Sequence, residues 1–171
     1  MSAIDALRKS VRALLRVLRP HAVEKAAGLG KGSLCAALDR DWNPTARTLL
    51  RLESFMVDQA PKRVAEEIGD NEDLIKVVER LRDLTANGDS GDACALIDLI
   101  VQGLNEFAEN RHNQVLVGEL SELTQEVTEQ RTGDALTRID RIVSALGGRN
   151  RLAVMPEELT VIDENDPAAE A

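Results

Sequence analysis

Apolar residues recur at intervals of three and four positions along most of the chain, which is the spacing of amphipathic α-helices. The first such stripe lies in residues 3–18 and consists of Ile4, Leu7, Val11, Leu14, Leu15 and Leu18. Four further stripes of similar length follow, in residues 71–85, 92–109, 113–130 and 132–146. Short polar connections separate them. The pattern therefore predicts an all-α protein in which each helix buries one face.

The segment between the first two stripes carries a shorter pattern, which predicts a helix, a glycine-bearing turn, a second short helix, a polar loop and a third helix. Gly28 is expected to close the first of these helices. Leu34 and Leu38, four positions apart, give the second helix a buried face. Asn43 followed by Pro44 predicts the start of the third, with the asparagine as cap and the proline in the first helical position. Two short helices that meet at a glycine turn form the core of a helix-turn-helix.

Residues 3–58 resemble the repressor-like helix-turn-helix family, which includes phage repressors and many small bacterial regulators. The resemblance rests on Ala27-Gly28-Leu29, Lys31-Gly32-Ser33-Leu34, Asn43-Pro44-Thr45 and Thr48-Leu49-Leu50-Arg51-Leu52-Glu53. It implies that the helix at residues 31–38 enters the major groove of DNA. Glu24 departs from the family pattern, because the family usually places a small residue four positions before the turn glycine.

The resemblance also implies which residues face the bases, namely Gly30, Lys31, Gly32, Ser33 and Ala36. Only Lys31 and Ser33 carry polar side chains at these positions. Sequence reading normally needs Arg, Lys, Asn or Gln to make paired hydrogen bonds in the major groove. We therefore expect this helix to read little sequence.

Charge divides the chain into a basic head and an acidic body. Residues 1–63 contain 12 Lys and Arg against 6 Asp and Glu, whereas the remainder contains 9 against 24. A basic head of this kind suits a polyanion such as DNA. The expected phosphate contacts are Arg12, Arg16, Arg40 and Arg47, which would give affinity without reading sequence. The alternative interpretation is that exposed helix faces simply carry arginine.

These observations predict four parts in the chain. Residues 1–60 form the helix-turn-helix DNA-binding domain, and residues 61–70 form a linker. Residues 71–148 form a helical bundle or dimerisation module, and residues 149–171 form an acidic, flexible tail. Dimerisation is a hypothesis that rests on the many apolar stripes in the second half of the chain.

Composition indicates what kind of core and which cellular compartment to expect for the protein. Apolar residues make up 43% of the chain but aromatic residues only 2%, so Leu, Ile, Val and Ala must build the core. No apolar run reaches the length of about 18 residues that a membrane span requires. Cys35 and Cys94 have no paired spacing, which favours a reduced, cytoplasmic setting. Together with His21 and His112, they also lack the spacing of metal ligands.

No catalytic arrangement is predicted. The run Gly28-Leu29-Gly30-Lys31-Gly32-Ser33 lacks the spacing and the preceding strand of a phosphate-binding loop. Carboxylates are abundant, but they lie on polar faces without a partnered histidine or nucleophile. We therefore expect a protein that is not an enzyme and that uses no metal or cofactor.

The predicted function is DNA-binding transcriptional regulation by a homodimer, which would place two recognition helices in successive major grooves of double-stranded DNA. Two alternatives remain open. A helical adaptor would use the helix-turn-helix shape for protein contact, because Gly30, Gly32 and Ala36 let another helix approach closely. The antitoxin of a toxin pair would instead cover a basic toxin with its acidic tail. The acidic C-terminal half as a whole is a candidate surface for a protein partner.

Overall fold

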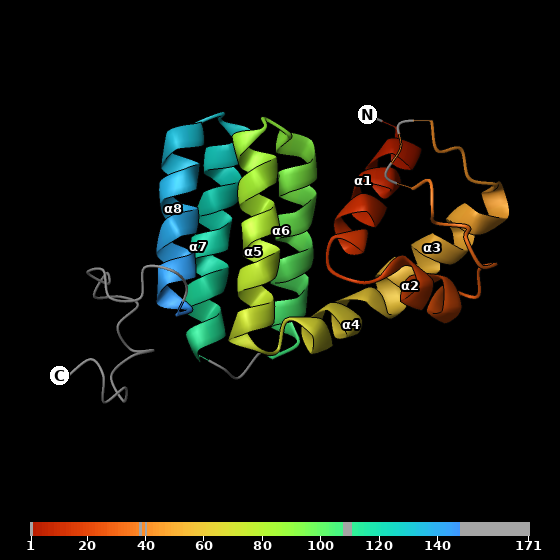
Figure 1. Cartoon of the computed structure of the whole chain (residues 1–171), viewed down its shortest axis with the longest axis horizontal. Helices are drawn as coiled ribbons and strands as arrows, with labels where there is room; N and C mark the ends of the chain where they lie inside the picture. The colour runs from red at the N-terminus through yellow and green to blue at the C-terminus, as the bar shows by residue number, and fades with distance from the viewer. Residues whose placement is uncertain (1, 38, 40, 108–110, 148–171) are drawn as a thin grey trace.

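The computed structural model describes residues 2–37, 39, 41–107 and 111–147, and this part of the chain forms helices joined by turns and loops, without strands (Figure 1). The helices are α1 (Ala3–Leu15), α2 (Pro20–Ala27), α3 (Ala46–Asp58), α4 (Ala60–Glu67), α5 (Asn71–Ala86), α6 (Ser90–Asn105), α7 (Arg111–Thr128) and α8 (Thr132–Ala145). The predicted all-α class is confirmed. The five long apolar stripes correspond to α1, α5, α6, α7 and α8.

Helices α5 to α8 stand side by side as an antiparallel bundle (Figure 1). Each helix contacts the next one along the chain, and α5 also contacts α8, which closes the bundle. Its buried residues include Leu74, Val77, Val78, Leu81, Leu84, Leu96, Ile97, Ile100, Leu104, Leu116, Leu120, Leu123, Val127, Ile139, Ile142 and Val143. The apolar stripes of the second half therefore cover one another within a single chain, so they no longer argue for dimerisation.

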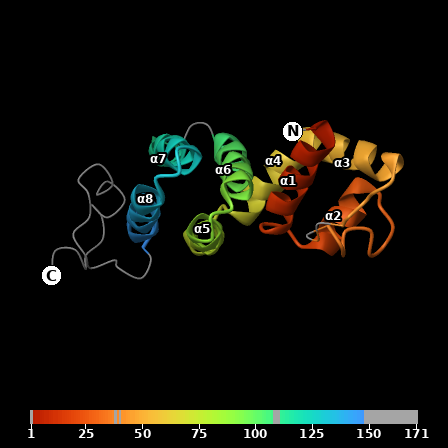
Figure 2. The same ribbon diagram turned by 90° about the horizontal axis from the view of Figure 1, so that it is seen from above.

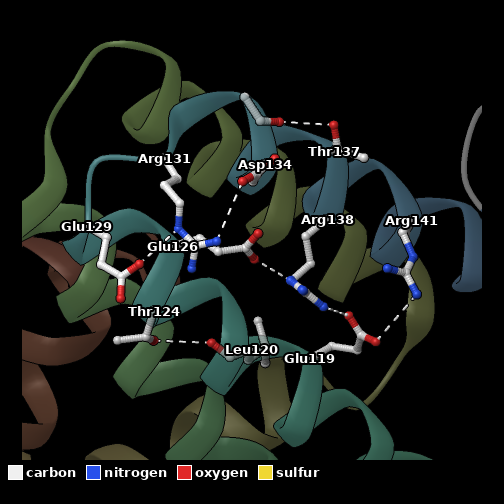
Figure 3. Close-up of polar contacts among 11 residues, drawn as sticks. Glu119, Leu120, Thr124, Glu126, Glu129, Arg131, Asp134, Thr137, Arg138 and Arg141 are labelled. Carbon is white, nitrogen blue, oxygen red and sulfur yellow. Dashed lines mark hydrogen bonds and ion pairs between the residues drawn. The ribbon is translucent and has the colours of Figure 1, made fainter.

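A partly buried group of ion pairs joins α7 to α8 (Figure 3). Arg138 Nη1 lies 2.6 Å from Glu119 Oε2, and Arg138 Nε donates to the buried carboxylate of Glu126. Arg141 lies 3.8 Å from the other oxygen of Glu119. Burial acts to lower the pKa of Arg138, but the hydrogen bonds to Glu126 and Glu119 outweigh it and raise that pKa. Loss of one partner would leave a charge poorly solvated, so these pairs fix how the two helices align.

The head, which comprises α1 to α4, lies on the α6 side of the bundle, with α1 and α4 in contact with α6 (Figure 2). Gly103 of α6 permits the close approach of α4. A Cβ atom at Gly103 would lie 2.8 Å from Val64 Cγ1 and 3.2 Å from the backbone nitrogen of Ala65. Val64, Ala65 and Ile68 are buried. Most of the segment expected as a linker, residues 61–70, is thus a helix packed against the bundle.

The second short helix expected at residues 31–38 is not formed in the described residues, and that prediction was wrong. Residues 31–37 instead make consecutive turns. These are closed by hydrogen bonds of 3.1 to 3.2 Å from Ser33 N to Gly30 O, from Cys35 N to Gly32 O and from Ala37 N to Leu34 O. Gly32 has a φ of +84°, a left-handed conformation that interrupts a right-handed helix. The Ser33 hydroxyl also donates to Gly30 O at 2.7 Å, in competition with the helical pattern.

Helix α3 begins later than expected. Its cap is Thr45, whose Oγ1 accepts a hydrogen bond from Thr48 N at 3.2 Å. The predictions that Asn43 caps this helix and that Pro44 occupies its first position were therefore wrong, because the threonine hydroxyl already satisfies an N–H group of the first turn. The expected end of the preceding helix is confirmed, since Gly28 terminates α2 with a φ of +72°.

Three sequence predictions fall on residues outside the described part of the chain. They are the buried position of Leu38, the phosphate contact by Arg40 and the acidic tail at residues 149–171, on which the antitoxin alternative depends. Among the helices that the structure describes, none combines the length and the apolar character needed to cross a membrane.

Candidate nucleic-acid interface

Helix α2 and the turn after it support the candidate interface. The helix starts with Pro20 in its first turn, where a missing N–H group costs little. It ends at Gly28, and Leu29 N then donates to Glu24 O at 2.8 Å. Arg51 of α3 donates to the carbonyl oxygen of Gly28, which joins α3 to the turn. The chain is thereby redirected into residues 30–37, which we name the contact segment.

Glu24 ties the contact segment to α2. Its side chain is only 3% exposed, and Oε2 accepts a hydrogen bond of 2.8 Å from the backbone N–H of Leu34. This bond is the main reason that the pKa of Glu24 lies below its ordinary value. Burial acts to raise that pKa, and the nearby Gly32 backbone and His21 act to lower it. His21 Nδ1 lies 3.8 Å from Glu24 Oε1. A buried carboxylate with backbone donors is satisfied despite its distance from water.

Apolar side chains supply a second anchor for this region. Leu34 is 1% exposed, and Ala37 and Trp42 are also buried in the core of the head. Leu34 and Ala37 therefore anchor the contact segment in the core of the head, and Glu24 anchors it to α2. Residues between these anchors are left at the surface.

The positions expected to face bases do lie on the surface of the contact segment. Gly30, Lys31, Gly32 and Ala36 are exposed, and Ser33 is half-buried with its hydroxyl bonded to Gly30 O. Lys31 is thus the charged side chain that this set presents to solvent. The two glycines leave the backbone open to close approach by a ligand.

Five other cations of the head bear on the candidate interface. Arg47, in the first turn of α3, is exposed, as are Lys25 on α2 and Arg19 just before it. Arg12 and Arg16 instead face α6, where Arg12 Nη2 lies 3.3 Å from Asp92 Oδ1 and Arg16 Nη2 lies 4.0 Å from Asp92 Oδ2. Both guanidinium groups are engaged within the molecule. We therefore leave Arg12 and Arg16 out of the proposed interface.

Two residues that organise the site were not singled out for this role by the sequence. Glu24 was visible only as a departure from the family pattern, and Arg51 only as part of a motif. Their partners, Leu34 and Gly28, lie 10 and 23 positions away, so the contacts depend on the folded arrangement. A lone acid on the apolar side of a short helix is the signal that points to a buried, satisfied carboxylate.

No group of three or more His, Cys, Asp or Glu side chains is arranged to hold a metal ion in the part of the chain that the structure describes. The candidate site consists of the exposed backbone of residues 30–37, a few exposed cations and the side chains that hold this segment in place. Comparison of the chain with protein-family models, curated proteins and solved structures finds no match.

Proposed function

We propose that the head binds double-stranded DNA through the contact segment and that the protein acts as a transcriptional regulator. The observation that carries this proposal is the way the contact segment is held. Glu24 and Leu34 fix its inner side, while Gly30, Lys31, Gly32 and Ala36 remain on the surface. An exposed segment with little side-chain bulk and a lysine suits close contact with a phosphate backbone.

The expected mode of binding is dominated by phosphate contacts. Lys31 and Arg47 are exposed cations, and neither the two glycines nor Ala36 can donate a side-chain hydrogen bond to a base edge. Affinity would then come chiefly from counterion release, which makes it fall steeply with salt. Sequence preference would be modest.

The test is DNA binding by the full chain across a salt series, with a pool of genomic DNA fragments as the ligand. Lys31→Ala should weaken binding to all fragments and reduce the magnitude of the slope of log affinity against log salt by about one, because one phosphate contact is lost. Lys76→Ala is the matched control, since Lys76 is an exposed lysine on α5 of the bundle. Equal effects of the two substitutions, or no binding at low salt, would contradict the proposal.

A second candidate function, protein contact by the head, is favoured by an apolar groove between α1 and α3. The groove has a volume of about 530 Å³ and is lined by Ala3, Ile4, Ala6, Leu7, Ser10, Ala46, Leu49, Leu50 and Glu53. Leu50 is 68% exposed and Ile4 is 47% exposed. We propose a second copy of this chain as the occupant of the groove, which would give the homodimer that the sequence analysis predicts and bury the exposed Leu50 and Ile4.

Sedimentation at increasing protein concentration tests this assignment. The wild-type chain should associate, and Leu50→Glu should shift the equilibrium to monomer, because it would place a charge in an apolar contact. Val57→Glu is a control of the same chemistry, since Val57 lies on α3 with 73% exposure but outside the residues that line the groove. A wild-type chain that stays monomeric at all concentrations rules out the second copy as the occupant.

A further inference from the structure

We propose that Glu24 is a positioning residue that holds the contact segment in the conformation that binds DNA. The inference rests on the proposed function for its DNA component. Among the described residues of the head, Glu24 is the one buried acid. It is also the residue that departs from the family pattern.

The first step of the argument concerns the hydrogen bonds that a helix would have made. In an α-helix, the N–H group of Leu34 would donate to the carbonyl oxygen of Gly30. Here that oxygen accepts instead from Ser33 N at 3.2 Å and from Ser33 Oγ at 2.7 Å. The N–H group of Leu34 would therefore be buried without a partner, and Glu24 Oε2 supplies one at 2.8 Å.

The second step concerns the strength of this contact. The acceptor is a carboxylate, and hydrogen bonds to charged groups stabilise more than neutral ones do. The pair lies beside the 1% exposed side chain of Leu34, away from competing water. The bond fixes the backbone directly after Ser33, whose own hydroxyl is bound to Gly30 O.

The third step separates positioning from direct contact. At 3% exposure, Glu24 does not reach a ligand outside the protein. Its negative charge would by itself repel DNA, so removal of the acid should strengthen binding if charge alone mattered. Weaker binding after its removal would therefore report the loss of the segment's conformation, which is the opposite sign.

The experiment compares Glu24→Ala and Glu24→Gln with Glu66→Ala, which removes an exposed acid from α4 of the same head. Three quantities are measured on the full chain: hydrogen exchange at the Leu34 amide, the emission of Trp42 and affinity for pooled DNA fragments. Trp42 is the only tryptophan in the sequence and is 6% exposed, so its emission reports this region alone.

Glu24→Ala should accelerate exchange at Leu34 about tenfold or more, shift Trp42 emission to longer wavelength and weaken DNA binding about tenfold. Glu24→Gln keeps an oxygen that can accept the bond, and it should restore much of each property. Glu66→Ala should leave exchange and emission unchanged and leave affinity unchanged or slightly higher. Far-UV circular dichroism shows whether each variant keeps its helices. If Glu24→Ala does not, the same three quantities are compared between Glu24→Gln and the wild type.

The outcomes distinguish this inference from the proposed function. If the wild-type chain binds DNA and Glu24→Ala changes neither exchange, emission nor affinity, the positioning role is overturned. If the wild-type chain binds no DNA, the proposed function fails and so does the DNA component of the inference. The exchange and emission measurements then still decide whether Glu24 holds the segment.

Discussion

At the scale of residues, Ser33 and Glu24 take the two groups, Gly30 O and Leu34 N–H, that would have bonded to each other in a helix. Ser33 occupies the carbonyl oxygen of Gly30, and Glu24 takes the N–H group of Leu34. Arg51 binds the carbonyl oxygen of Gly28 and so completes the support of the turn from α3. A segment without regular structure is thus held by a few directed contacts rather than by repetition of one backbone pattern.

The stabilisation by Glu24 should depend on pH. Because its folded pKa lies below the ordinary value of 4.5, its contribution is fully present above about pH 4.5 and is lost as pH falls through the lowered folded value. Denaturant unfolding of the wild-type chain and of Glu24→Gln, followed from pH 7 to pH 3, measures this difference. It should stay constant at the upper end of the range and shrink at the lower end.

Other acids do not disturb this comparison, because they are common to both proteins. The pKa of Asp5 is lowered mainly by the Ser2 hydroxyl, and that of Glu129 mainly by Gln125. His21 faces Glu24 on α2, and its interaction with the carboxylate is part of the difference that is measured. A difference that grows as pH falls would contradict the assigned role of the carboxylate.

At the scale of elements, the long helices could be predicted from the sequence, whereas the contact segment could not. The stripes of α5 to α8 repeat over four turns or more, so a buried face shows clearly in the order of residues. Residues 30–37 contain only Leu34 and Ala37 as buried positions, and Gly32 adopts a conformation that no periodicity reveals. The hydrogen bond of Glu24 joins residues whose proximity is set by folding.

Helix α4 shows a further limit of sequence patterns. Its buried residues Val64 and Ala65, with Ile68 directly after the helix, lie in the segment that the sequence analysis assigns to a linker. Helix α4 packs closely on α6 because Gly103, 38 positions beyond Ala65, has no side chain at the point of contact. A contact made possible by an absent side chain leaves no apolar signal in the sequence.

Substitution at Gly103 should therefore lower stability despite the better helix propensity of alanine. In Gly103→Ala the new Cβ atom would lie 2.8 Å from Val64 Cγ1 and 3.2 Å from Ala65 N, and backbone must move to relieve the second contact. We expect a loss of up to about 2 kcal/mol, because overpacking costs about 1–3 kcal/mol and the helix propensity returns about 1 kcal/mol.

Gly118 of α7 provides the matched control. An added Cβ atom there meets nothing within 4 Å, so Gly118→Ala should raise the free energy of unfolding by up to about 1 kcal/mol. Denaturant unfolding of both variants measures the two opposite changes. A gain in stability for Gly103→Ala would show that α4 does not pack on α6 as closely as described.

At the scale of the whole molecule, arginines in and directly after α1 bind the bundle rather than remaining free for a ligand. Arg12 and Arg16 both lie beside Asp92 at the start of α6, and Arg80 of α5 donates to the carbonyl oxygen of Arg16. These residues join the basic head to the acidic body. The basic surplus that the sequence showed is thus used partly inside the molecule, while Lys31 and Arg47 remain exposed as the cations of the proposed interface.

The packing of α1 and α4 on α6 bears on whether the head can exist apart from the bundle. A fragment of residues 1–60 alone would lose α4 and would expose to water the faces of α1 that α6 covers. Exposure of apolar surface costs free energy, so such a fragment should be less stable than the head within the full chain. We therefore expect the head and the bundle to unfold together.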